Sequence, residues 1–140
     1  MLVIDASAVV EVLTTDPVYI PDLARRVHDV EWMSAPGLID YEVLNVLRKM
    51  VGRGDIDAEF AESSRLALRD LRLVRHPMTD TMSDRIWQLR HNVSAYDASY
   101  IALAEHLGMP LITTERRLAQ GVHIMTSIDI ESYFEPSASD

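Results

Sequence analysis

The sequence predicts an α/β protein with a central, mostly parallel sheet of four to five strands flanked by helices. Short apolar runs alternate with stretches of helical spacing along the chain, which is the order typical of such sheets. A length of 140 residues fits one domain, and 48% apolar residues suffice for a full core. We expect residues 1–134 to form that single domain and residues 135–140 to be a frayed tail.

Apolar runs next to chain-breaking or charged residues define the expected strands, which are residues 1–4, 31–35, 71–75, 109–113 and 122–125. The residues that delimit these runs are, in the same order, Asp5, Pro36-Gly37, His76-Pro77, Gly108 and Gly121. A short closing turn is expected at residues 127–134.

Apolar residues spaced three and four apart define the expected helices, which are residues 6–13, 20–30, 38–51, 57–70, 79–91, 97–107 and 115–120. Residues 38–51 carry the clearest apolar stripe. Residues 93–105 are mostly small and apolar, and Ser94 with Asp97 resembles a capping box at the start of a helix. We therefore expect Asp97 in the first turn of a tightly packed helix.

The composition excludes several classes of function. Thirteen Lys and Arg against 22 Asp and Glu give a net charge of −9, which disfavours membrane surfaces and bulk electrostatic attraction to nucleic acid. A nucleic-acid enzyme is still possible, because clustered carboxylates bind divalent cations that invert the local charge. There is no cysteine for disulfides or thiolate metal sites, and no targeting or membrane-spanning run, so we expect a cytoplasmic protein.

Acidic residues stand where ligands bind in parallel sheets, beyond the carboxyl ends of the strands. Asp5 follows the first expected strand, and Glu42 lies one turn into the helix after the second. Asp97 opens the helix before the fourth strand, and Glu115 comes two residues after Thr113 at the end of that strand. Each acid alone has a simpler role as a helix cap, a dipole partner or a solvated side chain.

Together, these acids favour a metal site. Three or four carboxylates in one cleft repel each other unless cations neutralise them. Oxygen-only ligands suit Mg²⁺ or Mn²⁺, which can activate water at a phosphodiester.

Four stretches resemble those of the PIN-domain ribonucleases, and most closely the VapC toxins of toxin–antitoxin pairs. They are Ile4-Asp5-Ala6-Ser7, Glu42-Val43-Leu44-Asn45, Tyr96 to Ala104 (YDASYIALA) and Leu111 to Leu118 (LITTERRL). The third stretch is the most specific, and the four occur in order and at fitting spacing. The resemblance extends from Met1 to about Ser127.

The resemblance implies a PIN-like fold and Mg²⁺- or Mn²⁺-dependent endonuclease cleavage of RNA that leaves a 5′-phosphate and a 3′-hydroxyl. It maps the acidic quartet onto Asp5, Glu42, Asp97 and Glu115. The supporting polar residues map onto Ser7, Asn45 and Thr113. It also implies a homodimer and inhibition by a VapB-type antitoxin. The family's fourth acid is usually Asp, whereas this chain has Glu115, whose extra methylene allows contact with the metal directly or through water.

Two other functions fit parts of the pattern. A phosphatase or phospho-acceptor domain would use Asp5 as nucleophile, but it normally also needs a second nearby acid and a lysine, and Lys49 is the only lysine. A degenerate, non-catalytic PIN module is the other alternative, favoured by Glu115. Arg116 and Arg117 adjoin Glu115 and are candidate RNA phosphate contacts. Tyr96 is a candidate base-stacking residue, whereas we expect Trp32 and Trp87 in the core.

Overall fold

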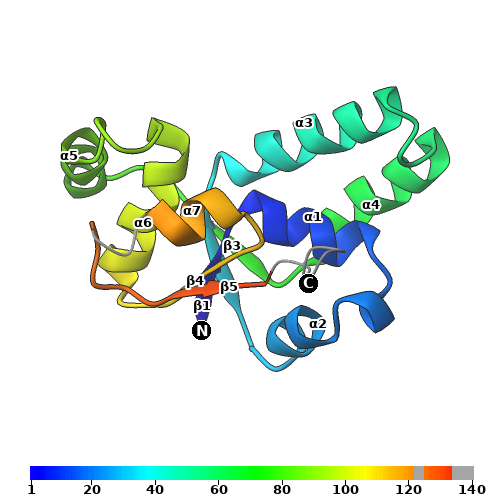
Figure 1. Cartoon of the computed structure of the whole chain (residues 1–140), viewed down its shortest axis with the longest axis horizontal. Helices are drawn as coiled ribbons and strands as arrows, with labels where there is room; N and C mark the ends of the chain where they lie inside the picture. The colour runs from blue at the N-terminus through cyan, green and yellow to red at the C-terminus, as the bar shows by residue number, and fades with distance from the viewer. Residues whose placement is uncertain (122–124, 134–140) are drawn as a thin grey trace.

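A computed structural model describes residues 1–121 and 125–133 of the chain. Five parallel strands form one sheet in the order β3-β2-β1-β4-β5. Their bounds are β1 Leu2–Ile4, β2 Met33–Pro36, β3 Leu73–His76, β4 Leu111–Thr113 and β5 Ile130–Ser132. The predicted α/β class with a parallel central sheet is therefore confirmed (Figure 1).

The helices also follow the predicted order. They are α1 Ala6–Thr14, α2 Pro21–His28, α3 Ile39–Gly52, α4 Ala58–Asp70, α5 Asp80–Gln88, α6 Ala95–Leu107 and α7 Arg116–Gly121, with the short 3-10 helix η1 at Pro17–Tyr19. Side chains of Asp5, Asp57, Thr79 and Ser94 cap α1, α4, α5 and α6 by accepting backbone N–H bonds. Gly108 ends α6 in the left-handed conformation.

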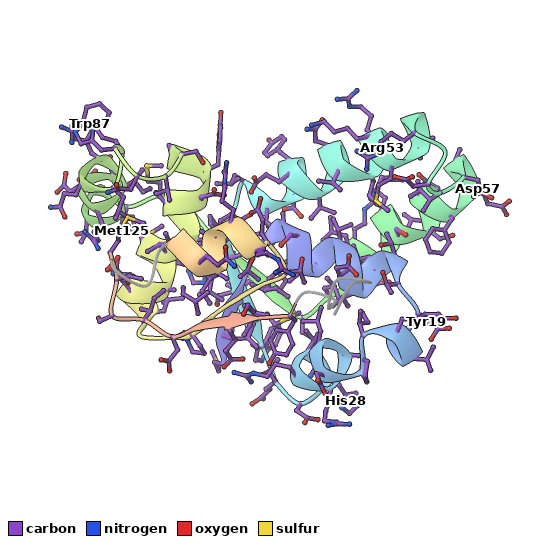
Figure 2. All side chains as sticks on the ribbon, in the orientation of Figure 1. Tyr19, His28, Arg53, Asp57, Trp87 and Met125 are labelled. Atoms are coloured by element: carbon purple, nitrogen blue, oxygen red, sulfur yellow. The ribbon has the colours of Figure 1, made fainter. Side chains whose placement is uncertain are left out.

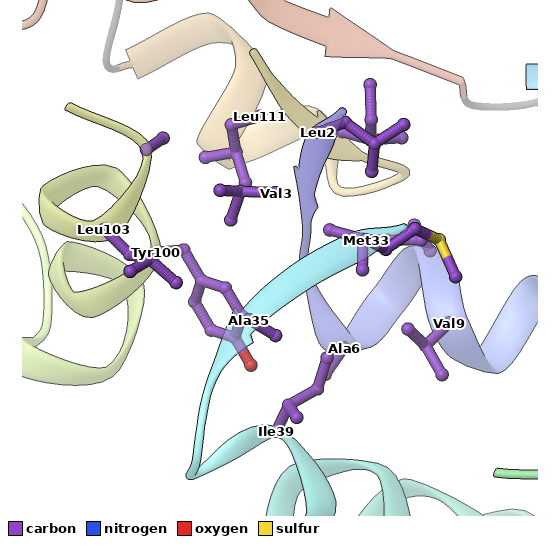
Figure 3. Packing of buried hydrophobic residues seen from close by; sticks show 14 of the residues in the cluster. Leu2, Val3, Ala6, Val9, Met33, Ala35, Ile39, Tyr100, Leu103 and Leu111 are labelled. Carbon is purple, nitrogen blue, oxygen red and sulfur yellow. The ribbon is translucent and has the colours of Figure 1, made fainter. Parts of the chain in front are cut away.

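Two helical layers cover the sheet. Helices α1, α3 and α4 pack against one another, and α5 packs against α6. Figure 3 shows Tyr100 and Leu103 of α6 on one side of β1 and β2, and Ala6 and Val9 of α1 on the other. The segment from Ala98 to Ala104 is buried on every face, which explains its small and apolar composition.

The strand order places a topological switch point between β1 and β4. From β1 the chain proceeds to β2 and β3 on one side, and from β3 it crosses to β4 and β5 on the other. In parallel sheets, the crevice at such a point, outside the carboxyl ends of the strands, is the usual ligand site. Asp5 directly follows β1, and Thr114 directly follows β4.

The structure contradicts the closing turn expected at residues 127–134 and the core positions expected for two tryptophans. Of the strand expected at residues 122–125, residues 122–124 lie outside the described part of the chain, and Met125 is in a turn. The fifth strand is instead Ile130–Ser132, inside the expected closing turn, and it pairs with β4. Trp32 and Trp87 are exposed rather than in the core. The expected tail, residues 135–140, also lies outside the described residues and stays a prediction.

Across residues 1–121 and 125–133, no helix combines the length and the apolar character that crossing a membrane requires.

Candidate active site

Asp5 is the buried centre of a polar network at the ends of β1 and β4. Its side chain is only 4% exposed and accepts hydrogen bonds from the Ser7 hydroxyl at 2.7 Å and the Ala8 N–H at 2.9 Å. The Thr113 hydroxyl donates to its other oxygen. Asp5 therefore caps α1, as the simpler interpretation predicted, and also stands at the switch point.

The end of β4 is tied to the same network. The Thr114 N–H donates to Ser7 Oγ at 3.2 Å, and the Glu115 N–H donates to Thr113 Oγ1 at 2.9 Å. These bonds fix the backbone that presents Glu115 next to the start of α1. Ser7 and Thr113, both predicted as supporting residues, thus hold the acidic residues of two strand ends in place.

Glu42 lies in the first turn of α3 and is half-buried. The hydroxyl of buried Tyr100, on α6, donates to Glu42 Oε1 at 2.6 Å. This bond joins the two helical layers across the pocket. No sequence motif predicts the Tyr100–Glu42 pair, although Tyr100 lies one helical turn after Asp97 and hence on the same face of α6.

Replacing Tyr100 with Phe should lower the free energy of unfolding by about 1–2 kcal/mol, because it leaves a half-buried carboxylate oxygen without its donor. Urea denaturation at pH 7 measures the change. Tyr133→Phe is a matched control, since its hydroxyl bonds Glu131 at 3.1 Å in a more exposed place. Equal losses in both variants would contradict a special role for the Tyr100–Glu42 bond.

Asp97 occupies the first turn of α6, as predicted. Its N–H donates to the capping Ser94 hydroxyl at 3.1 Å, which leaves the Asp97 carboxylate available to the pocket. A guanidinium nitrogen of Arg117 lies 3.5 Å from Asp97 Oδ2. Arg116 is exposed at the first residue of α7.

The four acids are electrostatically coupled. Burial, as the largest cause, raises the pKa of Asp5 from 3.8 to about 6, against the lowering effect of its hydrogen bonds. Burial also raises the pKa values of Glu42 and Glu115, and the negative charge of Asp97 raises both further. The fold therefore holds these carboxylates in places where their ionised form is unfavourable unless a cation binds beside them.

The acids line one pocket with a volume of about 710 Å³. Helix α3 forms one wall, where Glu42, Asn45, Lys49 and Arg53 recur three or four residues apart. Asn45 also accepts two hydrogen bonds from Arg48. The pocket thus runs from an acidic end at the switch point to Lys49 and Arg53 near the end of α3 (Figure 2 labels Arg53).

The donor chemistry fits a hard divalent cation. Asp5, Glu42, Asp97 and Glu115 offer only oxygen atoms, and their mutual repulsion would be relieved by positive charge. Within the described ranges, no group of three His, Asp or Glu side chains is arranged so that it could hold a metal ion without rearrangement. Mg²⁺ tolerates such a site, because it keeps several waters and needs only one or two direct carboxylates. The roles of the four acids in catalysis stay predictions.

Comparison with known proteins extends these observations. A family model described as "PIN domain" matches residues 2–122. Ribonuclease VapC9 of Mycobacterium tuberculosis is 37% identical over 119 residues, covering 85% of this chain and 89% of that protein. Ribonuclease VapC1 of the same organism is 38% identical over 120 residues, covering 84% and 87%. The structure of VapBC2 from Rickettsia felis, bound to a promoter DNA fragment, matches with a TM-score of 0.67 at 11% identity, covering 94% and 98%.

Proposed function

Because the chain belongs to the PIN-domain family and matches VapC ribonucleases over most of its length, we propose that it is an Mg²⁺- or Mn²⁺-dependent endoribonuclease. The observation that carries the proposal is the meeting of four carboxylates in one pocket at the switch point of the sheet. This arrangement suits hydrolysis of a phosphodiester, whose own negative charge excludes it from an acidic pocket unless a cation is present.

Asp5, Glu42 and Asp97 would hold the cation, and Glu115 would assist directly or through water. When bound, the cation would neutralise charge on the scissile phosphate and favour ionisation of the attacking water. The Asp5 network and the Tyr100–Glu42 bond keep two of the carboxylates oriented before substrate arrives. Lys49, which lines the pocket, and Arg117, which lies 3.5 Å from Asp97 Oδ2, would contact the phosphates of the RNA chain.

The reaction balances as a hydrolysis. The oxygen of water bonds to phosphorus, the bond between phosphorus and the 3′ oxygen breaks, and the products carry a 5′-phosphate and a 3′-hydroxyl. No side chain needs to form a covalent intermediate, which fits a buried Asp5 whose two oxygens already accept hydrogen bonds. The same observation disfavours a phosphatase that uses Asp5 as its nucleophile, even though Lys49 does line the pocket.

The relatives also suggest a biological role. A solved structure of similar fold is a toxin–antitoxin complex from Klebsiella pneumoniae, and we propose that this chain is likewise the toxin of a type II toxin–antitoxin pair, acting in the cytoplasm. A VapB-type antitoxin would then be its inhibitor and a second copy of the chain its partner in a homodimer. A degenerate PIN module remains the alternative, since Glu115 stands where the family usually has Asp.

Incubating the purified chain, freed of any partner, with total cellular RNA tests the proposed activity. We expect discrete cleavage in Mn²⁺ or Mg²⁺ and none in EDTA, because the acids need a cation to admit a phosphate. Calorimetric titration with Mn²⁺ alone provides a second readout. If the protein neither cleaves RNA nor binds Mn²⁺, the proposal is overturned in favour of the degenerate module.

A further inference from the structure

Two of the most exposed aromatic side chains in the described part of the molecule stand directly before pocket acids. Tyr41 is 79% exposed and precedes Glu42, and Tyr96 is 65% exposed and precedes Asp97. Exposed aromatic rings lower solubility and contribute little to the core. Two of them, each directly before a pocket acid, therefore indicate a binding role.

Helical spacing places each tyrosine on the same helix face as a pocket-lining residue, one turn away from it. Tyr96 lies four residues before Tyr100 on α6, and Tyr41 lies four residues before Asn45 on α3. Both Tyr100 and Asn45 line the pocket. The Tyr100 hydroxyl also bonds Glu42, so the two exposed tyrosines flank the bond that joins α3 to α6 at the acidic end.

We propose that Tyr41 and Tyr96 stack the bases that adjoin the scissile phosphate of the RNA. This inference rests on the proposed ribonuclease function and adds its specificity-determining residues. Base-paired RNA hides its base faces within the helix, whereas splayed bases in loops expose them to aromatic side chains.

The charge of the molecule supports stacking as a source of affinity. With a net charge of −9, the chain has no overall electrostatic attraction for RNA. Cations at the pocket are few, with Lys49 and Arg53 at one end and Arg117 paired with Asp97 at the other. Stacking does not depend on net charge, and each base–aromatic contact changes affinity by about 5- to 150-fold.

Binding of a fluorescein-labelled, single-stranded oligoribonucleotide of mixed sequence tests the inference when it is followed by anisotropy in Mn²⁺, with every tyrosine variant made in the cleavage-deficient Asp97→Asn protein. Tyr41→Ala and Tyr96→Ala should each raise the Kd at least about fivefold, while Tyr→Phe variants keep the Kd of the Asp97→Asn parent because the ring suffices. Tyr19→Ala is the matched control, since Tyr19 is 72% exposed on η1 and is not among the residues that line the pocket. The same oligoribonucleotide with abasic sites should bind the parent and the Ala variants alike.

Unchanged Kd in both Ala variants would overturn the inference, and so would equal losses in the Phe and Ala variants. If the Ala variants kept RNA affinity but lost affinity for a protein inhibitor, the tyrosines would be a protein-docking surface instead. These binding results can be distinguished from a failure of the proposed ribonuclease function, which is measured by cleavage. Wild-type protein that binds RNA through the tyrosines but cleaves none in Mn²⁺ would contradict the nuclease and leave the binding site standing.

Discussion

RNA cleavage by an Asp97→Asn variant should fall by at least about 100-fold, the effect of removing one preorganised electrostatic group from an active site. The fold should persist, because the helix cap uses the backbone N–H of residue 97 and asparagine keeps it. Loss of the charge in the first turn of α6 removes a helix-dipole contribution of about 0.3–1 kcal/mol, but it also relieves the repulsion between Asp97 and the carboxylates of Glu42 and Glu115, so stability should change by less than about 1 kcal/mol. Cleavage assays on RNA in Mn²⁺, with urea denaturation in parallel, separate the two effects.

Asp22→Asn is the matched control for this prediction. Asp22 is also an acid in the first turn of a helix, α2, but it is exposed and outside the pocket. The control should change stability by a similarly small amount and keep full activity. Wild-type activity in pure Asp97→Asn protein would remove Asp97 from the site, and equal inactivation of both variants would indicate a general loss of structure.

Without divalent cations, the protein should lose up to about 3 kcal/mol of stability as the pH rises from 4 to 8. The pKa of Asp5 is raised from 3.8 to about 6 in the folded state, so the fold favours the protonated carboxyl. That stabilisation is complete below the unfolded pKa of 3.8 and is lost as the pH rises through about 6. The raised pKa values of Glu42 and Glu115 act in the same direction.

Urea denaturation in EDTA at pH 4 and pH 8 measures this dependence. Asp5→Asn should largely flatten it, since asparagine carries no charge to bury. Asp57→Asn is the control, because Asp57 caps α4 through the Phe60 N–H at 2.7 Å but is exposed. An unaltered slope in Asp5→Asn would show that Asp5 does not titrate as its burial requires.

The placement of the acids could be predicted from the sequence, because parallel strands bring their carboxyl ends to one edge. Asp5, Glu42, Asp97 and Glu115 all follow strands or open helices at that edge, and they do meet in one pocket. Lys49 is the single lysine of the chain. Its place in the pocket follows from its spacing of seven residues from Glu42 on α3.

Other features depend on tertiary contacts that a single sequence does not encode locally. The Tyr100–Glu42 bond joins residues 58 positions apart. Strand β5 is a short edge strand of half-exposed and exposed residues, so it lacks the apolar run that identified the other strands. The helical spacing of apolar residues around Trp87 predicts that its ring is buried. The ring is instead exposed on the outside of α5 (Figure 2), and Arg90 Cζ lies 4.7 Å from its centroid.

The double role of Asp5, as helix cap and pocket acid, has an evolutionary consequence. Asparagine is as good a cap as aspartate, and it removes a buried charge. If Asp5 is catalytic, as proposed, a single nucleotide change at this codon would yield an inactive protein that keeps the cap of α1 and its fold. If the chain is a toxin, selection for cells that survive it would favour such folded, inactive variants. These variants would still compete with the active protein for the antitoxin.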